Sequence, residues 1–92
     1  MTQYQVEVIG RHAEGTVTRF TVRIDGRSYD VGVPHEYVSR LVPGSDAAEL
    51  LHRSMLFLLE REPPESILRR FDLPVISRYF PEYESAMRGT EP

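Results

Sequence analysis

The sequence of 92 residues predicts a single α+β domain: a three-stranded antiparallel sheet packed by one long helix, followed by two or three short C-terminal helices. Three observations predict this class. Apolar and polar residues alternate in the first third of the chain, apolar residues then recur with helical spacing, and prolines interrupt the last third. The predicted organisation is residues 1–44 as a β meander with a connecting turn, 45–62 as the long helix and 63–92 as a tail of short helices.

The first two strands are predicted from this alternation. Tyr4, Val6 and Val8 are separated by polar residues, which is the pattern of a half-buried strand. Residues 10–15 begin and end with glycine and are predicted to form a loop. Alternation resumes from Val17 to Ile24, so this segment is the predicted second strand.

Asp25-Gly26 predicts a tight hairpin between the second and third strands, because a type I′ turn needs positive φ at both central residues. The turn brings apolar side chains together on one face of the sheet, and a one-residue slip would destroy this agreement. The predicted pairs are Ile24 with Arg27, Val22 with Tyr29, Phe20 with Val31 and Thr18 with Val33.

A short helical turn is predicted for residues 34–41, and the long helix follows. Ser45 is its predicted N-cap, and Glu49 and Arg53 are spaced to form an ion pair on its surface. The apolar stripe that should cover the sheet consists of Ala47, Leu51, Ser54, Met55 and Leu58. Leu56 falls on the opposite side, where it is either a simple exposed leucine or part of a second packing surface.

The tail is predicted to form short helices over about residues 64–71, over residues 73–80 with Asp72 as the cap, and from Pro81 onward. Each of these helices is too short to be stable alone. We therefore expect them to pack on the long helix or on a partner chain.

The composition argues against several classes of protein. The chain has no cysteine, which excludes disulfides and thiolate metal sites. It has no apolar run near the ~18 residues of a membrane helix, and its polar start is unlike a signal peptide, so a cytoplasmic protein is expected. All 11 basic residues are arginine and the net charge is −3. Because no segment is strongly basic, nonspecific nucleic-acid binding is not expected.

No segment predicts a catalytic, metal or cofactor site. Residues 35–39 begin like the zinc motif HExxH, but Ser39 stands where the second histidine ligand belongs. The serines lie in no GxSxG elbow, and the glycines form neither a P-loop nor a dinucleotide fingerprint. An enzyme with a composite active site from distant residues is the third alternative for the function.

Two parts of the chain resemble known families. The stretches 57–63, 66–68, 71–73 and 75–83 together resemble a family of small uncharacterised bacterial proteins, a resemblance that implies no activity. Three strands followed by Gly44 to Leu50 at the start of a helix are similar to HicB-like antitoxins. That resemblance implies a small, oligomeric regulator associated with DNA or a toxin, although no fourth strand is predicted after the helix. An antitoxin-like regulator is the first alternative for the function.

The function expected from the sequence is that of a non-catalytic interaction or regulatory protein that self-associates as a homodimer. The tail carries more large aromatic side chains than a small sheet and one helix need, and such side chains are typical interface anchors. The other interpretation is that they cover the core of their own chain. The residues expected to bind a partner are Leu56, Phe71, Tyr79, Phe80 and Tyr83.

Overall fold

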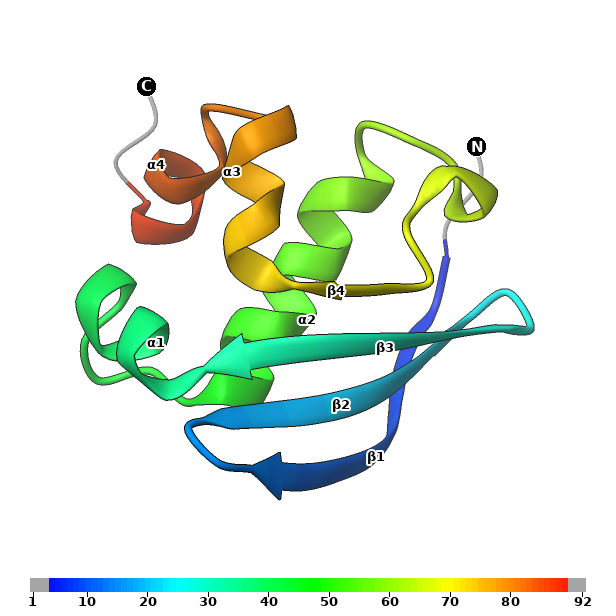
Figure 1. Ribbon diagram of the computed structural model, residues 1–92. Coiled ribbons are helices and arrows are strands. Elements are labelled where there is room, and N and C mark those ends of the chain that lie inside the picture. Colours follow the sequence, from blue (N-terminus) through cyan, green and yellow to red (C-terminus); the bar gives the residue numbers. More distant parts are fainter. Residues whose placement is uncertain (1–3, 90–92) are drawn as a thin grey trace.

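The computed structural model describes residues 4–89 and contains a four-stranded mixed sheet with the strand order β1-β2-β3-β4 (Figure 1). The first three strands are antiparallel, and β4 pairs with β3 in parallel. The predicted three-stranded antiparallel sheet under one long helix is therefore wrong, although the α+β class is right. Residues 1–3, which are part of the polar start that argues against a signal peptide, lie outside the described range. The strands are β1 (Val6–Glu14), β2 (Val17–Ile24), β3 (Arg27–Pro34) and β4 (Arg70–Asp72).

Four α-helices and two short 3₁₀ turns complete the described part of the chain. Figure 1 shows α2 crossing one face of the sheet, while α1, α3 and α4 gather near the end at which β3 finishes. No helix among residues 4–89 is long and apolar enough to cross a membrane. The helices are α1 (His35–Leu41), α2 (Ala47–Leu59), α3 (Ile76–Tyr79) and α4 (Tyr83–Arg88), and the 3₁₀ turns are Pro64–Ser66 and Leu73–Val75.

The hairpin between β2 and β3 has the predicted register. Asp25 and Gly26 have φ angles of 52° and 78°, as a type I′ turn requires. All four predicted pairs are present, and the apolar side chains of these pairs are buried in the core. Phe20 is 1% exposed, whereas Arg23 on the opposite face is exposed. Local turn chemistry and the alternation of side chains are thus sufficient to predict this part of the fold.

β1 is longer than predicted. Its pairing with β2 shifts between Val8 and Gly10, which marks a β-bulge, and then continues to Glu14. The predicted loop over residues 10–15 is therefore wrong, because only a two-residue turn at Gly15 and Thr16 separates the two strands. The second half of β1 is exposed on both faces, so no alternation of apolar residues marks it as a strand.

The long helix begins and ends inside its predicted limits. Asp46 replaces Ser45 as the N-cap, because its carboxylate accepts a hydrogen bond from the backbone N–H of Glu49 at 2.8 Å. The predicted ion pair of Glu49 is not formed, since Arg53 instead donates to the backbone oxygen of Met87 at 2.7 Å. This contact joins α2 to the end of α4.

The fourth strand replaces the helix predicted over residues 64–71. The chain makes a 3₁₀ turn, then runs beside β3, and Phe71 is its one buried side chain. The backbone N–H of Asp30 donates to the oxygen of Arg69 at 2.8 Å, which joins the two strands. Asp72 does not cap the next helix as predicted, since its side chain makes no cap bond.

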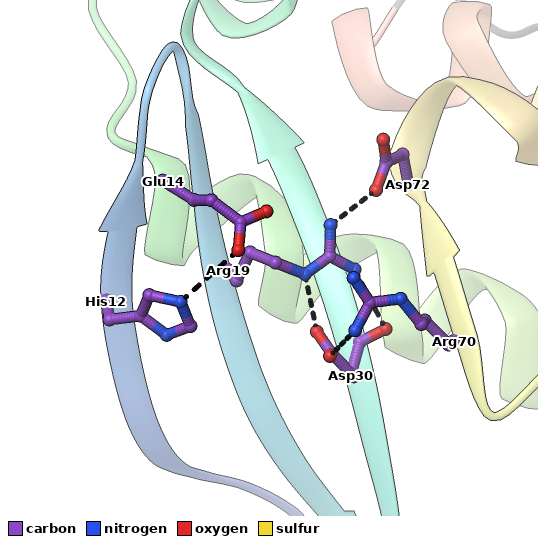
Figure 2. A network of polar contacts seen from close by, with 6 residues as sticks. All are labelled: His12, Glu14, Arg19, Asp30, Arg70 and Asp72. Carbon is purple, nitrogen blue, oxygen red and sulfur yellow. Dashed lines mark hydrogen bonds and ion pairs between the residues drawn. The ribbon is translucent and has the colours of Figure 1, made fainter.

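A charged network on the outer face of the sheet holds β4 in place (Figure 2). Arg19 of β2 lies across β3, and its Nε and Nη1 atoms donate to Asp30 at 2.7 Å and to Asp72 at 2.9 Å. Arg70 pairs with the other carboxylate oxygen of Asp30. The guanidinium of Arg19 can cross β3 only because Gly32 has no side chain. A Cβ atom there would lie 2.2 Å from Oδ1 of Asp72 and 2.5 Å from Nη1 of Arg19.

Candidate functional site

A cavity of about 330 Å³ opens beside the C-terminal end of α2. Pockets of this size are large enough to hold a small ligand or the side chain of a protein partner. Its wall comes from the end of α2, the segment that leads into β4, and α3. The lining residues are Leu58, Glu62, Ser66, Ile67, Leu68, Phe71, Val75, Ile76, Tyr79 and Phe80.

The wall of this pocket is held by contacts to the sheet. Pro63 and Pro64 prevent α2 from continuing, and the chain turns back toward β3. The buried hydroxyl of Tyr29 donates to the backbone oxygen of Pro64 at 2.6 Å, so β3 fixes this turn. Phe71 of β4 also lines the pocket, and its neighbours Arg70 and Asp72 belong to the charged network that holds β4 beside β3.

The rim of the pocket is apolar and open to solvent. Leu68 is 50% exposed and Tyr79 is 65% exposed, although both are large hydrophobic side chains. Phe80 is half-buried, and its ring meets the ring of Phe57 edge to face at a centroid distance of 6.0 Å. Exposed apolar side chains grouped around a pocket are typical of an interaction site. We call Leu68, Tyr79 and the pocket that they border the pocket surface.

Glu62 is the only carboxylate in the lining of the pocket. Burial raises the pKa of its side chain, and this carboxylate makes no ion pair or hydrogen bond among residues 4–89. Its neighbour Arg61 cannot neutralise it. Arg61 donates to Glu82 at 3.0 Å, and its guanidinium lies 3.5 Å from the ring centroid of Phe57. The pocket thus presents a hydrogen-bond acceptor to whatever enters it.

The structure divides the five residues expected to bind a partner. Phe71, Tyr79 and Phe80 line the pocket together, whereas Leu56 lies outside it and is 42% exposed. Tyr83 is 0% exposed, so the core of its own chain covers it. Its hydroxyl is 2.6 Å from that of Ser54, and burial raises its pKa to about 12.

Leu68 and Glu62 of the pocket are not among the residues predicted from the sequence. Leu68 belongs to a segment for which the sequence predicts a helix, whereas the structure places it between a 3₁₀ turn and β4. Glu62 is one of several glutamates around the end of α2, and only the fold shows which of them faces the pocket. No local sequence signal distinguishes it.

The histidine of the incomplete zinc motif has a different role. His35 Nε2 lies 2.8 Å from the hydroxyl of Thr18, so it joins the start of α1 to β2. Tyr37, in the same motif, donates to Glu84 of α4 at 2.8 Å. No group of three histidine, aspartate or glutamate side chains in the described range is arranged to hold a metal ion.

Comparisons with protein families, with curated proteins and with solved structures found no match to the chain. The two resemblances seen in the sequence therefore stay predictions. A strand does follow the long helix, contrary to the sequence prediction, but strand order alone carries no function.

Proposed function

We propose that the protein is a non-catalytic interaction module that pairs with a second copy of itself through the pocket surface. The observation that carries this proposal is an apolar pocket whose rim leaves Leu68 and Tyr79 exposed to water. Burying two such side chains in a partner's pocket removes apolar area from water, which is the main driving force of association. A two-fold axis would use each contact twice, as in most small oligomers.

Charge complementarity favours a second copy as the occupant. Glu62 places an unpaired carboxylate in the pocket, and Arg78 stands directly before Tyr79 on α3. Arg78 is exposed and makes no ion pair in the part of the chain that the structure describes. When Tyr79 of one copy enters the pocket of the other, Arg78 comes with it and meets Glu62. This contact would neutralise a partly buried charge, which costs free energy when it is left alone.

The chemistry of the pocket favours binding over catalysis. Glu62 is the acidic side chain of its lining, and Ser66 and Tyr79 carry hydroxyl groups, but neither hydroxyl makes a hydrogen bond with Glu62 in the described structure. A serine or tyrosine nucleophile is commonly activated by a base within hydrogen-bond reach of its hydroxyl. The remaining lining side chains are apolar or aromatic, which suits them to contact.

Light scattering over a micromolar concentration series tests the proposal. We expect the wild-type protein to approach twice the mass of one chain. Tyr79→Ser and Leu68→Ser should shift the protein toward the single chain, because each removes apolar area from the proposed interface. Circular dichroism of each variant shows whether it is still folded.

Leu56→Ser is the matched control, because Leu56 is exposed to 42% and Leu68 to 50%, and only Leu68 borders the pocket. The control should keep the wild-type mass. A wild-type protein with the mass of one chain throughout the series would refute self-association. A monomer produced by Leu56→Ser alone would transfer the interface to the outer side of α2.

A further inference from the structure

A second depression, of about 530 Å³, lies between α1, the start of α2 and the end of α4. It differs in character from the pocket surface, because none of its lining residues is acidic and three are arginines from three different helices. The arginines are Arg40 of α1, Arg53 of α2 and Arg88 of α4.

The three arginines have hydrogen-bond donors to spare. The guanidinium of Arg40 lies 5.2 Å from the ring centroid of Tyr37, a stacking contact that uses no N–H group. Arg53 uses one nitrogen, Nη2, to reach the backbone oxygens of Met87 and Ala86. Arg88 makes no hydrogen bond or ion pair within residues 4–89. A guanidinium has five N–H donors, so most of those around the depression have no protein acceptor.

Helix stability explains why two of these arginines stand where they do, but it does not explain why all three side chains share one depression. Arg40 and Arg88 each stand in the last turn of their helix, where a positive charge interacts well with the helix dipole. That effect acts within each helix and does not require the side chains to share one depression. Bringing three like charges together is unfavourable unless an anion compensates them. Glu36, Glu49 and Glu84 stand one helical turn before the three arginines, but none of them lines the depression or makes an ion pair with an arginine of it within residues 4–89, and Glu84 already accepts from Tyr37.

We propose that this depression binds the phosphate group of a small phosphorylated molecule. Arg40, Arg53 and Arg88 would donate to the phosphate oxygens, which match the planar fork of a guanidinium. The hydroxyl of Ser45 makes no hydrogen bond in the described structure and offers a further donor. The apolar side of the depression, from Leu41, Val42 and Met87, contacts the organic part of the ligand.

Titrations followed by amide NMR test this site, with ionic strength held constant by sodium chloride. The probes are inorganic phosphate, phenyl phosphate and a short DNA duplex. We expect saturable shifts of the amides around residues 40–45 and 86–89, with phenyl phosphate bound more tightly than inorganic phosphate. Arg40→Gln and Arg88→Gln should each weaken binding about tenfold, because each removes charged hydrogen bonds from an open site. Arg40 and Arg88 are replaced singly and Arg53 is left in place, because Arg53 also joins α2 to α4 and its loss could disturb the fold.

Arg23→Gln is the matched control, since Arg23 is exposed on the far face of the sheet and the charge change is the same. It should leave the affinity for phenyl phosphate unchanged. Shifts that do not saturate, or an equal loss in the control, would overturn the site. Equal affinity for phenyl phosphate and inorganic phosphate would refute the proposal of a phosphorylated organic ligand and would indicate a site for the free phosphate ion. Tighter binding of the DNA duplex than of phenyl phosphate would refute the proposal of a small ligand and would indicate a nucleic-acid site.

Discussion

Adding one methyl group at Gly32 should loosen β4, because that position is where Arg19 crosses β3. A Cβ atom there would lie 2.2 Å from Oδ1 of Asp72 and 2.5 Å from Nη1 of Arg19. Both distances are far below a normal contact, so Gly32→Ala must push the two side chains apart. The same substitution at Gly10, on the same face of the sheet, would place Cβ at an ordinary 3.6 Å from the hydroxyl oxygen of Thr21.

The magnitude follows from the exposure of the ion pair. The side chain of Arg19 is 8% exposed and that of Asp72 is 50% exposed. Hydrogen bonds to charged groups contribute about 1.5–3 kcal/mol when buried and exposed pairs about 0.2–1 kcal/mol, so we assign about 1–2 kcal/mol to this one. Overpacking by the added methyl group lowers the free energy of unfolding by about 1 kcal/mol more. Alanine also restricts the unfolded chain, which raises the free energy of unfolding by about 0.4–1 kcal/mol. The net expected loss of unfolding free energy is about 1–2.6 kcal/mol.

Urea unfolding of the wild type, Gly32→Ala and Gly10→Ala measures these differences. Gly10→Ala should be neutral or slightly stabilising, because it restricts only the unfolded chain. Equal unfolding free energies for the two glycine variants would refute the reasoning.

A double-mutant cycle tests whether the destabilisation by Gly32→Ala arises from its contact with Asp72. In an Asp72→Ala background, Gly32→Ala no longer meets a carboxylate and presses only on the flexible end of Arg19. The substitution should then cost less than in the wild type, which is the coupling expected of residues in contact. A cost that is unchanged by Asp72→Ala would mean that Gly32 acts through the backbone alone.

Two further predictions concern the core. In urea unfolding, Phe20→Ala should lower the free energy of unfolding by about 3–5 kcal/mol. Arg23→Ala should change the free energy of unfolding by less than about 0.5 kcal/mol. Similar effects of the two substitutions would contradict the hairpin register. Tyr83 favours the neutral phenol in the folded chain, so its contribution is fully present below pH 10 and is lost as the pH rises to about 12. Over this window the wild type should lose about 2–3 kcal/mol more than Tyr83→Phe, and parallel pH profiles would show that Tyr83 does not titrate differently on folding.

The sequence alone determined the β2–β3 hairpin and the presence of α2. The hairpin depends on a turn of two residues, Asp25 and Gly26, and on a period of two, and both are local properties of the chain. α2 depends on a stripe of apolar residues with helical spacing, and Leu51 and Met55 from that stripe are fully buried. Where neighbouring residues set the backbone, the sequence is sufficient.

Only the tertiary structure decided the fourth strand and the two sites that follow from the fold. β4 has three residues and one buried side chain, which is too short for any periodicity, and its partner Asp30 lies far away in the sequence. The sequence predicts Asp72 as a helix cap, but its carboxylate accepts a hydrogen bond from Arg19 of β2 and makes no cap bond. Glu62 and Arg88 are ordinary surface residues by sequence. Their neighbours come from other elements, and packing between distant segments leaves no mark on local spacing.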